Sequence, residues 1–155
     1  MRRHVLDDLR YVLPHLLRQG QGHIVVVSSG AGHRSFPQAA VYGATKAAQR
    51  MFAEALRHEL SGTGVSLTTV VPGEIATSLH DHEKERMPSW YRGGAKAAPA
   101  RTMADHVLRG VERDARFVHH PPLVRLLGIV NGVSPQAADA MLRRMRGPSA
   151  APRTD

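Results

Sequence analysis

The sequence predicts an α/β fold in which helices flank a parallel β-sheet. Two short β-branched runs, HIVVVSS at 23–29 and VSLTTVV at 65–71, each follow a segment with helical spacing. Helices and strands that alternate along a chain predict parallel strands, because each helix carries the chain back to the same end of the sheet. The run at 23–29 has no polar alternation, which is typical of a strand covered by helices on both faces.

The other elements follow from periodicity and turn residues. Apolar residues at helical spacing predict a helix over 3–18, and the Ala-rich segment 38–60, which ends before the turn SGTG, predicts another. Residues 102–114 predict a further amphipathic helix, and ARFVHHP at 115–121 predicts a third short strand. The alternation therefore continues to about residue 121.

The C-terminal residues divide into an apolar stretch, an amphipathic helix and a polar end. Ser134 and Pro135 form an N-cap and first-turn pair, which predicts a helix that runs to Arg146. We expect 121–147 to be a helical tail. The Pro-rich residues 148–155 match no periodic pattern, so we expect them to be disordered.

Composition limits the class of protein. A length of 155 residues with 42% hydrophobic residues suits one globular domain. The chain has no cysteine, which excludes disulfides and thiolate metal sites. Its first twenty residues carry four arginines, unlike a signal peptide, and no run is long and apolar enough to span a bilayer. We expect a cytoplasmic protein.

The formal net charge of +8 is spread along the chain, and its densest group is Arg143, Arg144 and Arg146. Few aromatics and no nucleic-acid-binding motif accompany it, so a solvated basic face is favoured over a nucleic-acid partner. Peripheral contact of the apolar tail with anionic lipid stays open as a minority alternative. The histidines at 80–83 and 119–120 lack the spacing of a helical zinc motif, so we expect no metal.

Candidate catalytic groups occur in the segment VYGATKA. Tyr42 and Lys46 are four residues apart, so on a helix they share one face. A nearby ammonium favours the phenolate and lowers the pKa of a tyrosine, which makes an acid/base pair. Ser29 precedes Tyr42 by thirteen residues and ends the first strand, where its hydroxyl could bind a substrate oxygen. The second strand ends at the same edge with Pro72.

Three motifs, SSGAG, YGATK and VVPGEIAT, occur in the order and spacing that resemble the short-chain dehydrogenase/reductase family. The resemblance covers about residues 1–120 and implies a Rossmann-like parallel sheet. It implies an NAD(P)-dependent oxidoreductase that transfers hydride between the cofactor and a small carbonyl or alcohol substrate, and a homo-oligomer. NAD and NADP are not distinguished.

The resemblance also implies roles for particular residues. Tyr42 would donate or accept the proton, Lys46 would lower its pKa and bind the nicotinamide ribose, and Ser29 would orient the substrate oxygen. The implied catalytic residues are thus Ser29, Tyr42 and Lys46, and the implied cofactor-binding residues are Tyr42, Lys46, Pro72, Gly73, Ile75 and Thr77.

The sequence departs from the family in one respect, because it contains no Gly-rich turn of the type TGxxxGxG, which holds the pyrophosphate in family members. We therefore expect 1–120 to correspond to the carboxy-terminal half of such a domain, which carries the catalytic motif, and we expect the chain to bind NAD(P)H weakly or not at all. The alternative is a noncatalytic remnant that serves as an oligomerisation or interaction module. We also expect the strand at 23–29 to present an unpaired edge that invites self-association.

Overall fold

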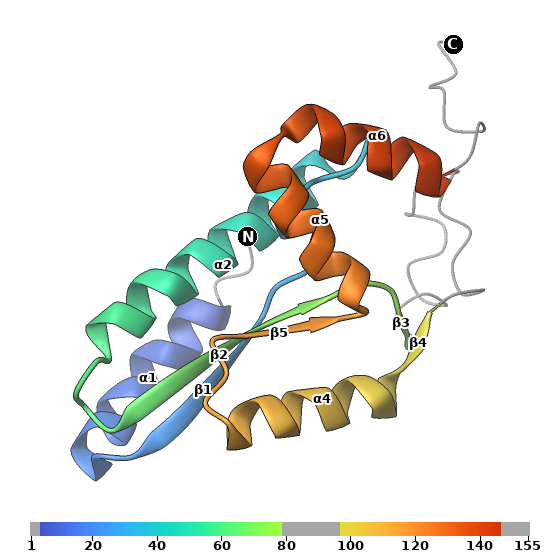
Figure 1. The fold of residues 1–155 in the computed structure, drawn as a ribbon. Coiled ribbons are helices and arrows are strands. Elements are labelled where there is room, and N and C mark those ends of the chain that lie inside the picture. The colour runs from blue at the N-terminus through green and yellow to red at the C-terminus, as the bar shows by residue number, and fades with distance from the viewer. Residues whose placement is uncertain (1–3, 79–96, 147–155) are drawn as a thin grey trace.

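The computed structural model describes residues 4–78 and 97–146 of the chain (Figure 1). Helices and strands alternate as the sequence predicts, and the sheet is parallel. The elements are α1 (His4–Gln19), β1 (Gly22–Val27), the 3-10 helix η1 (Gly30–Gly32), α2 (Ala40–Glu59), β2 (Val65–Pro72), β3 (Ile75–Ala76), β4 (Ala98–Pro99), α4 (Ala100–Glu112), β5 (Phe117–His120), α5 (Pro122–Val133) and α6 (Pro135–Arg146).

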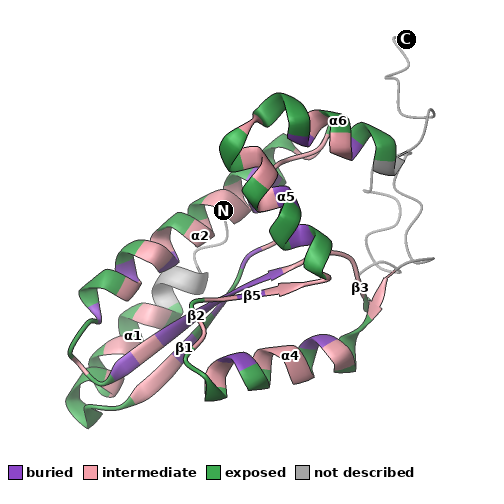
Figure 2. Ribbon diagram, viewed as in Figure 1, coloured by how far each residue is buried: buried purple, intermediate pink, exposed green. Residues whose placement is uncertain are grey.

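Within residues 4–78 and 97–146, the main sheet has three strands in the order β1-β2-β5, all parallel. Gly22 lies opposite Val65, and Thr69 lies opposite Phe117. The central strand β2 is buried along most of its length, as Figure 2 shows. The fold is thus the predicted Rossmann-like α/β arrangement, with the carboxyl ends of the strands on the side where β3 and α5 lie (Figure 1).

Helices cover the two faces of this sheet unequally. On one face of the sheet, α1 and α2 pack against β1 and the amino-terminal part of β2. The cluster between them includes Ile24, Val26, Leu56 and Leu67. On the other face, α4 packs against β2 and β5 through a smaller cluster centred on Met103. The larger core therefore lies between the strands β1 and β2 on one side and the helices α1 and α2 on the other.

The boundaries of the helices match the sequence signals. Gly20 adopts a positive φ of 68°, a conformation that favours glycine, directly after α1. Ser134 acts as the predicted N-cap of α6, because its Oγ accepts a hydrogen bond from the N–H of Ala137 at 3.2 Å. Among the helices of the described residues, none is long and apolar enough to cross a bilayer.

Two features differ from the sequence-based expectations. Helices do not cover both faces of β1: Val25 is 39% exposed and Val27 is 53% exposed, while Ile24 and Val26 are buried. A run of four apolar residues reads as buried on both sides, but β1 lies at the edge of the main sheet, where only one face is covered. The short pair β3 and β4 was not predicted. Residues 79–96, 1–3 and 147–155, including the tail expected to be disordered, lie outside the described residues.

Candidate active site

The end of β1 and the first part of α2 are held together by two contacts. Ser28 is almost fully buried, and its Oγ donates a hydrogen bond to the backbone carbonyl of Lys46 at 2.7 Å. In return, Nζ of Lys46 donates to the backbone carbonyl of Val27 at 3.1 Å. The two contacts run in opposite directions between the same segments, so they fix the position of the Lys46 ammonium relative to the end of the strand.

Tyr42 and Lys46 share one face of α2, as their spacing predicts. Nζ of Lys46 lies 5.9 Å from the centre of the Tyr42 ring, within the range of a cation–π contact. Tyr42 is half exposed, so its phenol is accessible to a ligand. Burial lowers the pKa of Lys46 from its ordinary value, because the ammonium is partly removed from water.

Ser29 follows Ser28 and is the N-cap residue of η1. Its Oγ accepts a hydrogen bond from the N–H of Ala31 at 3.2 Å and so caps this short helix. The hydroxyl hydrogen is not used in that contact and remains available to donate. Ser29 lies two residues after Val27, whose carbonyl accepts from Lys46. The contact of its hydroxyl with a substrate oxygen stays a prediction.

The predicted cofactor-binding loop follows β2. A Cβ placed on Gly30 would lie 3.6 Å from the carbonyl oxygen of Pro72, so the ends of β1 and β2 meet at the same edge of the sheet. The N–H of Gly73 donates to the carbonyl of His120 at 2.7 Å, which fixes the exit from β2. Ile75 packs toward the α4-side core, and Thr77 is exposed. Their assignment to a cofactor remains a prediction.

Two histidines whose contact the sequence analysis did not predict lie side by side near this edge of the sheet. Nε2 of His33, just after η1, lies 3.3 Å from Nε2 of His119 on β5, and the two rings are stacked. Burial, with Arg50 and His119 as further causes, lowers the pKa of His33 to about 4. The pKa of His119 is lowered mainly by burial, with smaller effects of Arg125 and Arg50. The pair is therefore neutral near pH 7, with one nitrogen donating and the other accepting.

The helices α5 and α6 hold the loop between Ser29 and Tyr42. Nδ2 of Asn131 donates to the carbonyl of His33 at 3.0 Å. Arg34 donates to Oδ1 of Asp139 through Nε at 2.9 Å and Nη2 at 2.6 Å. Arg34 and Asp139 are 105 residues apart in the sequence, a separation that no local pattern reveals.

The structure places a half-exposed phenol and an ammonium on one face of α2 and ties that ammonium to the end of β1, which Ser29 follows by two residues. The meeting of Ser29 with Tyr42 at one substrate oxygen stays a prediction. The residues that sequence reasoning missed are structural partners. The sequence indicated Ser28 only as part of a strand end, and no local pattern predicts its hydrogen bond with Lys46. The carbonyl of Val27 cannot be singled out from the sequence either, because every residue has a backbone carbonyl.

Comparisons with known proteins show the family of the chain. The family described as short chain dehydrogenase matches residues 5–88. An 11-beta-hydroxysteroid dehydrogenase-like protein of Arabidopsis thaliana is 32% identical over 133 residues, which cover 83% of this chain and 40% of the relative. The match thus spans less than half of that relative's length.

Solved structures show the same fold. A short chain dehydrogenase from Burkholderia cenocepacia, in complex with NADP, superposes with a TM-score of 0.72 at 26% identity, over 89% of this chain and 54% of that one. A short chain dehydrogenase/reductase from Burkholderia phymatum, in complex with NAD, gives a TM-score of 0.66 at 23% identity, over 96% of this chain and 58% of that one. Each match spans little more than half of the solved chain.

Proposed function

The chain belongs to the short-chain dehydrogenase family, and on that premise we propose that it is an NAD(P)-dependent oxidoreductase that interconverts a small carbonyl compound and its alcohol. The observation that carries the proposal is the shared face of Tyr42 and Lys46, anchored to the end of β1 through the carbonyl of Val27. Tyr42 transfers the proton, Lys46 supports its charge, and Ser29 orients the substrate oxygen.

The residues present fit the nicotinamide end of the cofactor. An ammonium has three N–H donors, and the contact with Val27 uses one, which leaves donors on Lys46 for the hydroxyls of a ribose. Pro72, Gly73, Ile75 and Thr77 would border the nicotinamide from the neighbouring strand end. The cofactor, when bound, supplies or accepts the hydride. NAD and NADP are equally compatible with these residues.

The proton step depends on the environment of the phenol. In the reductive direction Tyr42 donates its hydroxyl proton to the substrate oxygen as negative charge develops there, and in the oxidative direction the phenolate accepts that proton. The positive charge of Lys46 stabilises the phenolate in either direction. The hydroxyl of Ser29 donates to the same oxygen and holds the carbonyl beside the phenol.

A second candidate is a noncatalytic interaction module, and one observation favours it. The outer edge of β1 carries exposed valines next to a groove, which suits binding to another polypeptide. The two functions separate in a titration of the 155-residue chain with NADH and NADPH. Failure to bind either cofactor would favour the module.

The proton role is tested by Tyr42→Phe, which removes the transferable proton and little else. We expect carbonyl-dependent oxidation of NAD(P)H to fall by about 10²-fold or more, the typical contribution of general acid catalysis, with cofactor affinity nearly unchanged. The matched control is Tyr11→Phe, because Tyr11 is 78% exposed on α1. Equal turnover in the two variants would refute the role of Tyr42.

The cofactor role is tested by Lys46→Met, which keeps the length of the side chain but removes the ammonium. Because Lys46 is proposed both to bind the ribose and to stabilise the phenolate, the Kd for NAD(P)H should rise and turnover should fall. Fluorescence titration and steady-state kinetics measure the two effects separately. A variant that loses turnover with an unchanged Kd would remove ribose binding from the proposal.

A further inference from the structure

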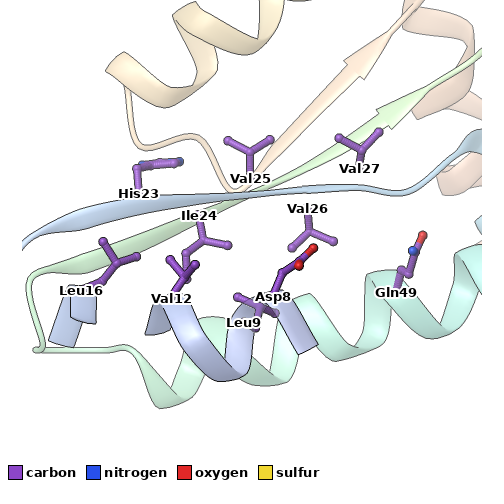
Figure 3. A pocket seen from close by; sticks show the side chains of 10 residues that line it. All are labelled: Asp8, Leu9, Val12, Leu16, His23, Ile24, Val25, Val26, Val27 and Gln49. Carbon is purple, nitrogen blue, oxygen red and sulfur yellow. The ribbon is translucent and has the colours of Figure 1, made fainter. Parts of the chain in front are cut away.

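Two parts of α2 are held in place by different parts of the chain. The turn that carries Lys46 is tied to the end of β1, because Oγ of Ser28 donates to the carbonyl of Lys46 and Nζ of Lys46 donates to the carbonyl of Val27. Further along α2, Gln49 lines the groove beside β1 that Val26 and Val27 also line (Figure 3). From Lys46 onward, α2 is therefore positioned by contacts with this strand.

The first turn of α2, which carries Tyr42, is held instead by the loop that precedes it. Ala39 occupies the N-cap position and makes no side-chain cap. The N–H of Ala39 donates to the carbonyl of Phe36 at 3.1 Å, and Oγ of Ser35 donates to the carbonyl of Ala39 at 2.8 Å. Gly43, the residue after Tyr42, packs so closely on Ser35 that an added Cβ would overlap it. The position of the phenol therefore depends on where this loop lies.

The loop is itself held by the helices α5 and α6. Arg34 donates to Oδ1 of Asp139 on α6 through Nε at 2.9 Å and through Nη2 at 2.6 Å. Phe36 packs against the buried cluster of these two helices, which consists of Leu127, Ala138 and Leu142. A series of contacts therefore runs from α5 and α6 through Arg34 and Phe36 to the first turn of α2.

We propose that Arg34 and Asp139 are positioning residues for Tyr42, through which α5 and α6 affect the proton step. The inference rests on the proposed function, in which the phenol transfers the proton. Proton transfer needs the phenol within about 2.6–3.2 Å of the substrate oxygen, so a shift of the first turn of α2 slows this step. Lys46 is held by β1 instead, so its proposed contact with the cofactor does not depend on the ion pair.

The first test is hydrogen exchange of backbone amides in the 155-residue chain, measured by NMR, which does not require activity. The N–H of Gly43 donates to the carbonyl of Ala39 at 2.8 Å and so reports on the first turn of α2. Asp139→Ala removes the acceptor of Arg34, in an ion pair whose side chains are 34% and 39% exposed. We expect exchange at Gly43 to become about twofold to fivefold faster, the effect of losing one partly exposed ion pair, while amides beyond Lys46 keep their rates.

The matched control is Glu112→Ala, which also removes a carboxylate, at an exposed position of α4. Exchange at Gly43 should not change in this control. Arg34→Ala should have the same effect as Asp139→Ala, and the double variant should show no more than either, because each change breaks the same contact. Unchanged exchange in Asp139→Ala, or additive effects in the double variant, would overturn the proposal.

The second test separates positioning from a general loss of structure, with benzaldehyde and cyclohexanone as carbonyl probes. Asp139→Ala should lower kcat by about tenfold, because a misplacement of about 1 Å can cost about 10²-fold, and should leave the Kd for NAD(P)H unchanged. Arg34→Lys, which keeps the charge, should retain more of kcat than Arg34→Ala.

Two outcomes of the second test contradict different claims. A Kd that rises together with the loss of kcat would show that the ion pair supports the whole site, and the positioning role would be wrong. A parent chain that binds neither NADH nor NADPH would contradict the proposed function instead, and exchange at Gly43 would then decide by itself whether α5 and α6 position the first turn of α2.

Discussion

The carboxyl end of β1 and the outer edge of β1 belong to the same six-residue strand and its continuation, yet they differ in what holds them. At the carboxyl end, Ser28 and Lys46 form hydrogen bonds with backbone carbonyls inside the chain. At the outer edge, Val25 and Val27 have no described strand beside them. The carboxyl end is therefore fixed by contacts within this chain, whereas the described residues place no strand against the outer edge.

This difference separates two kinds of positioning. The proposed catalytic groups need a defined geometry, and buried directional contacts supply it, because a shift of either partner would leave a polar group unpaired. Apolar edge side chains gain from any surface that removes them from water, with little demand on direction. Substitutions should therefore disturb the chain strongly at the carboxyl end and weakly at the edge.

The largest effect on stability is expected from Gly43→Ala in α2. A Cβ at this position would overlap the side chain of Ser35 and approach the carbonyl of Ala31 to 3.2 Å, so the loop that follows η1 would have to move. We expect a loss of about 1–3 kcal/mol in the free energy of unfolding, typical of overpacking. Urea unfolding followed by circular dichroism measures it.

The matched control for that substitution is Gly132→Ala in α5, where an added Cβ meets no atom within 4 Å. Because alanine is favoured over glycine in a helix, the free energy of unfolding of this variant should rise by about 0.5–1 kcal/mol. Equal effects of the two substitutions would mean that the segment carrying Tyr42 is not tightly packed against the loop, and the contrast between the two regions of β1 would lose its basis.

An intermediate effect is expected from Ser28→Ala. This change removes the hydrogen bond to the carbonyl of Lys46 and should cost about 1 kcal/mol, the usual contribution of one such bond. Ser61→Ala, at an exposed position after α2, should change stability by less than about 0.5 kcal/mol. Chemical denaturation of both variants compares them, and no difference between them would show that the Ser28 contact does not anchor α2.

Much of the fold follows from the sequence, because periodicity and turn residues are local properties. The order of strands and helices, the shared face of Tyr42 and Lys46 and the N-cap Ser134 are all visible in stretches of a few residues. The edge position of β1 among the described strands is not visible in the residues VVV themselves, and the expectation of an unpaired edge at 23–29 rests only on the resemblance to the family. Which strand lies beside which is decided by contacts far apart in sequence.

The same limit applies to the candidate site. The sequence indicates which side chains could perform the chemistry, but the roles of Ser29, Tyr42 and Lys46 remain predictions. The contacts around them involve groups that the local sequence does not identify, because Lys46 binds a backbone carbonyl 19 positions away and Ser28 binds the carbonyl of Lys46. Functional groups are specified by side-chain chemistry, whereas the contacts that hold them are specified by the fold.

The smallest effect is expected from Val27→Thr, directly beside Ser28 but on the outer edge. Val27 is 53% exposed, so a hydroxyl in place of a methyl group stays in contact with water, and threonine is as compatible with a strand as valine is. The free energy of unfolding should therefore change by less than about 0.5 kcal/mol. Urea unfolding of the variant and the parent chain measures this difference. A loss above about 1 kcal/mol would mean that Val27 is packed against other parts of the chain, since exposed positions rarely show so large an effect, and the outer edge would then be as firmly held as the carboxyl end.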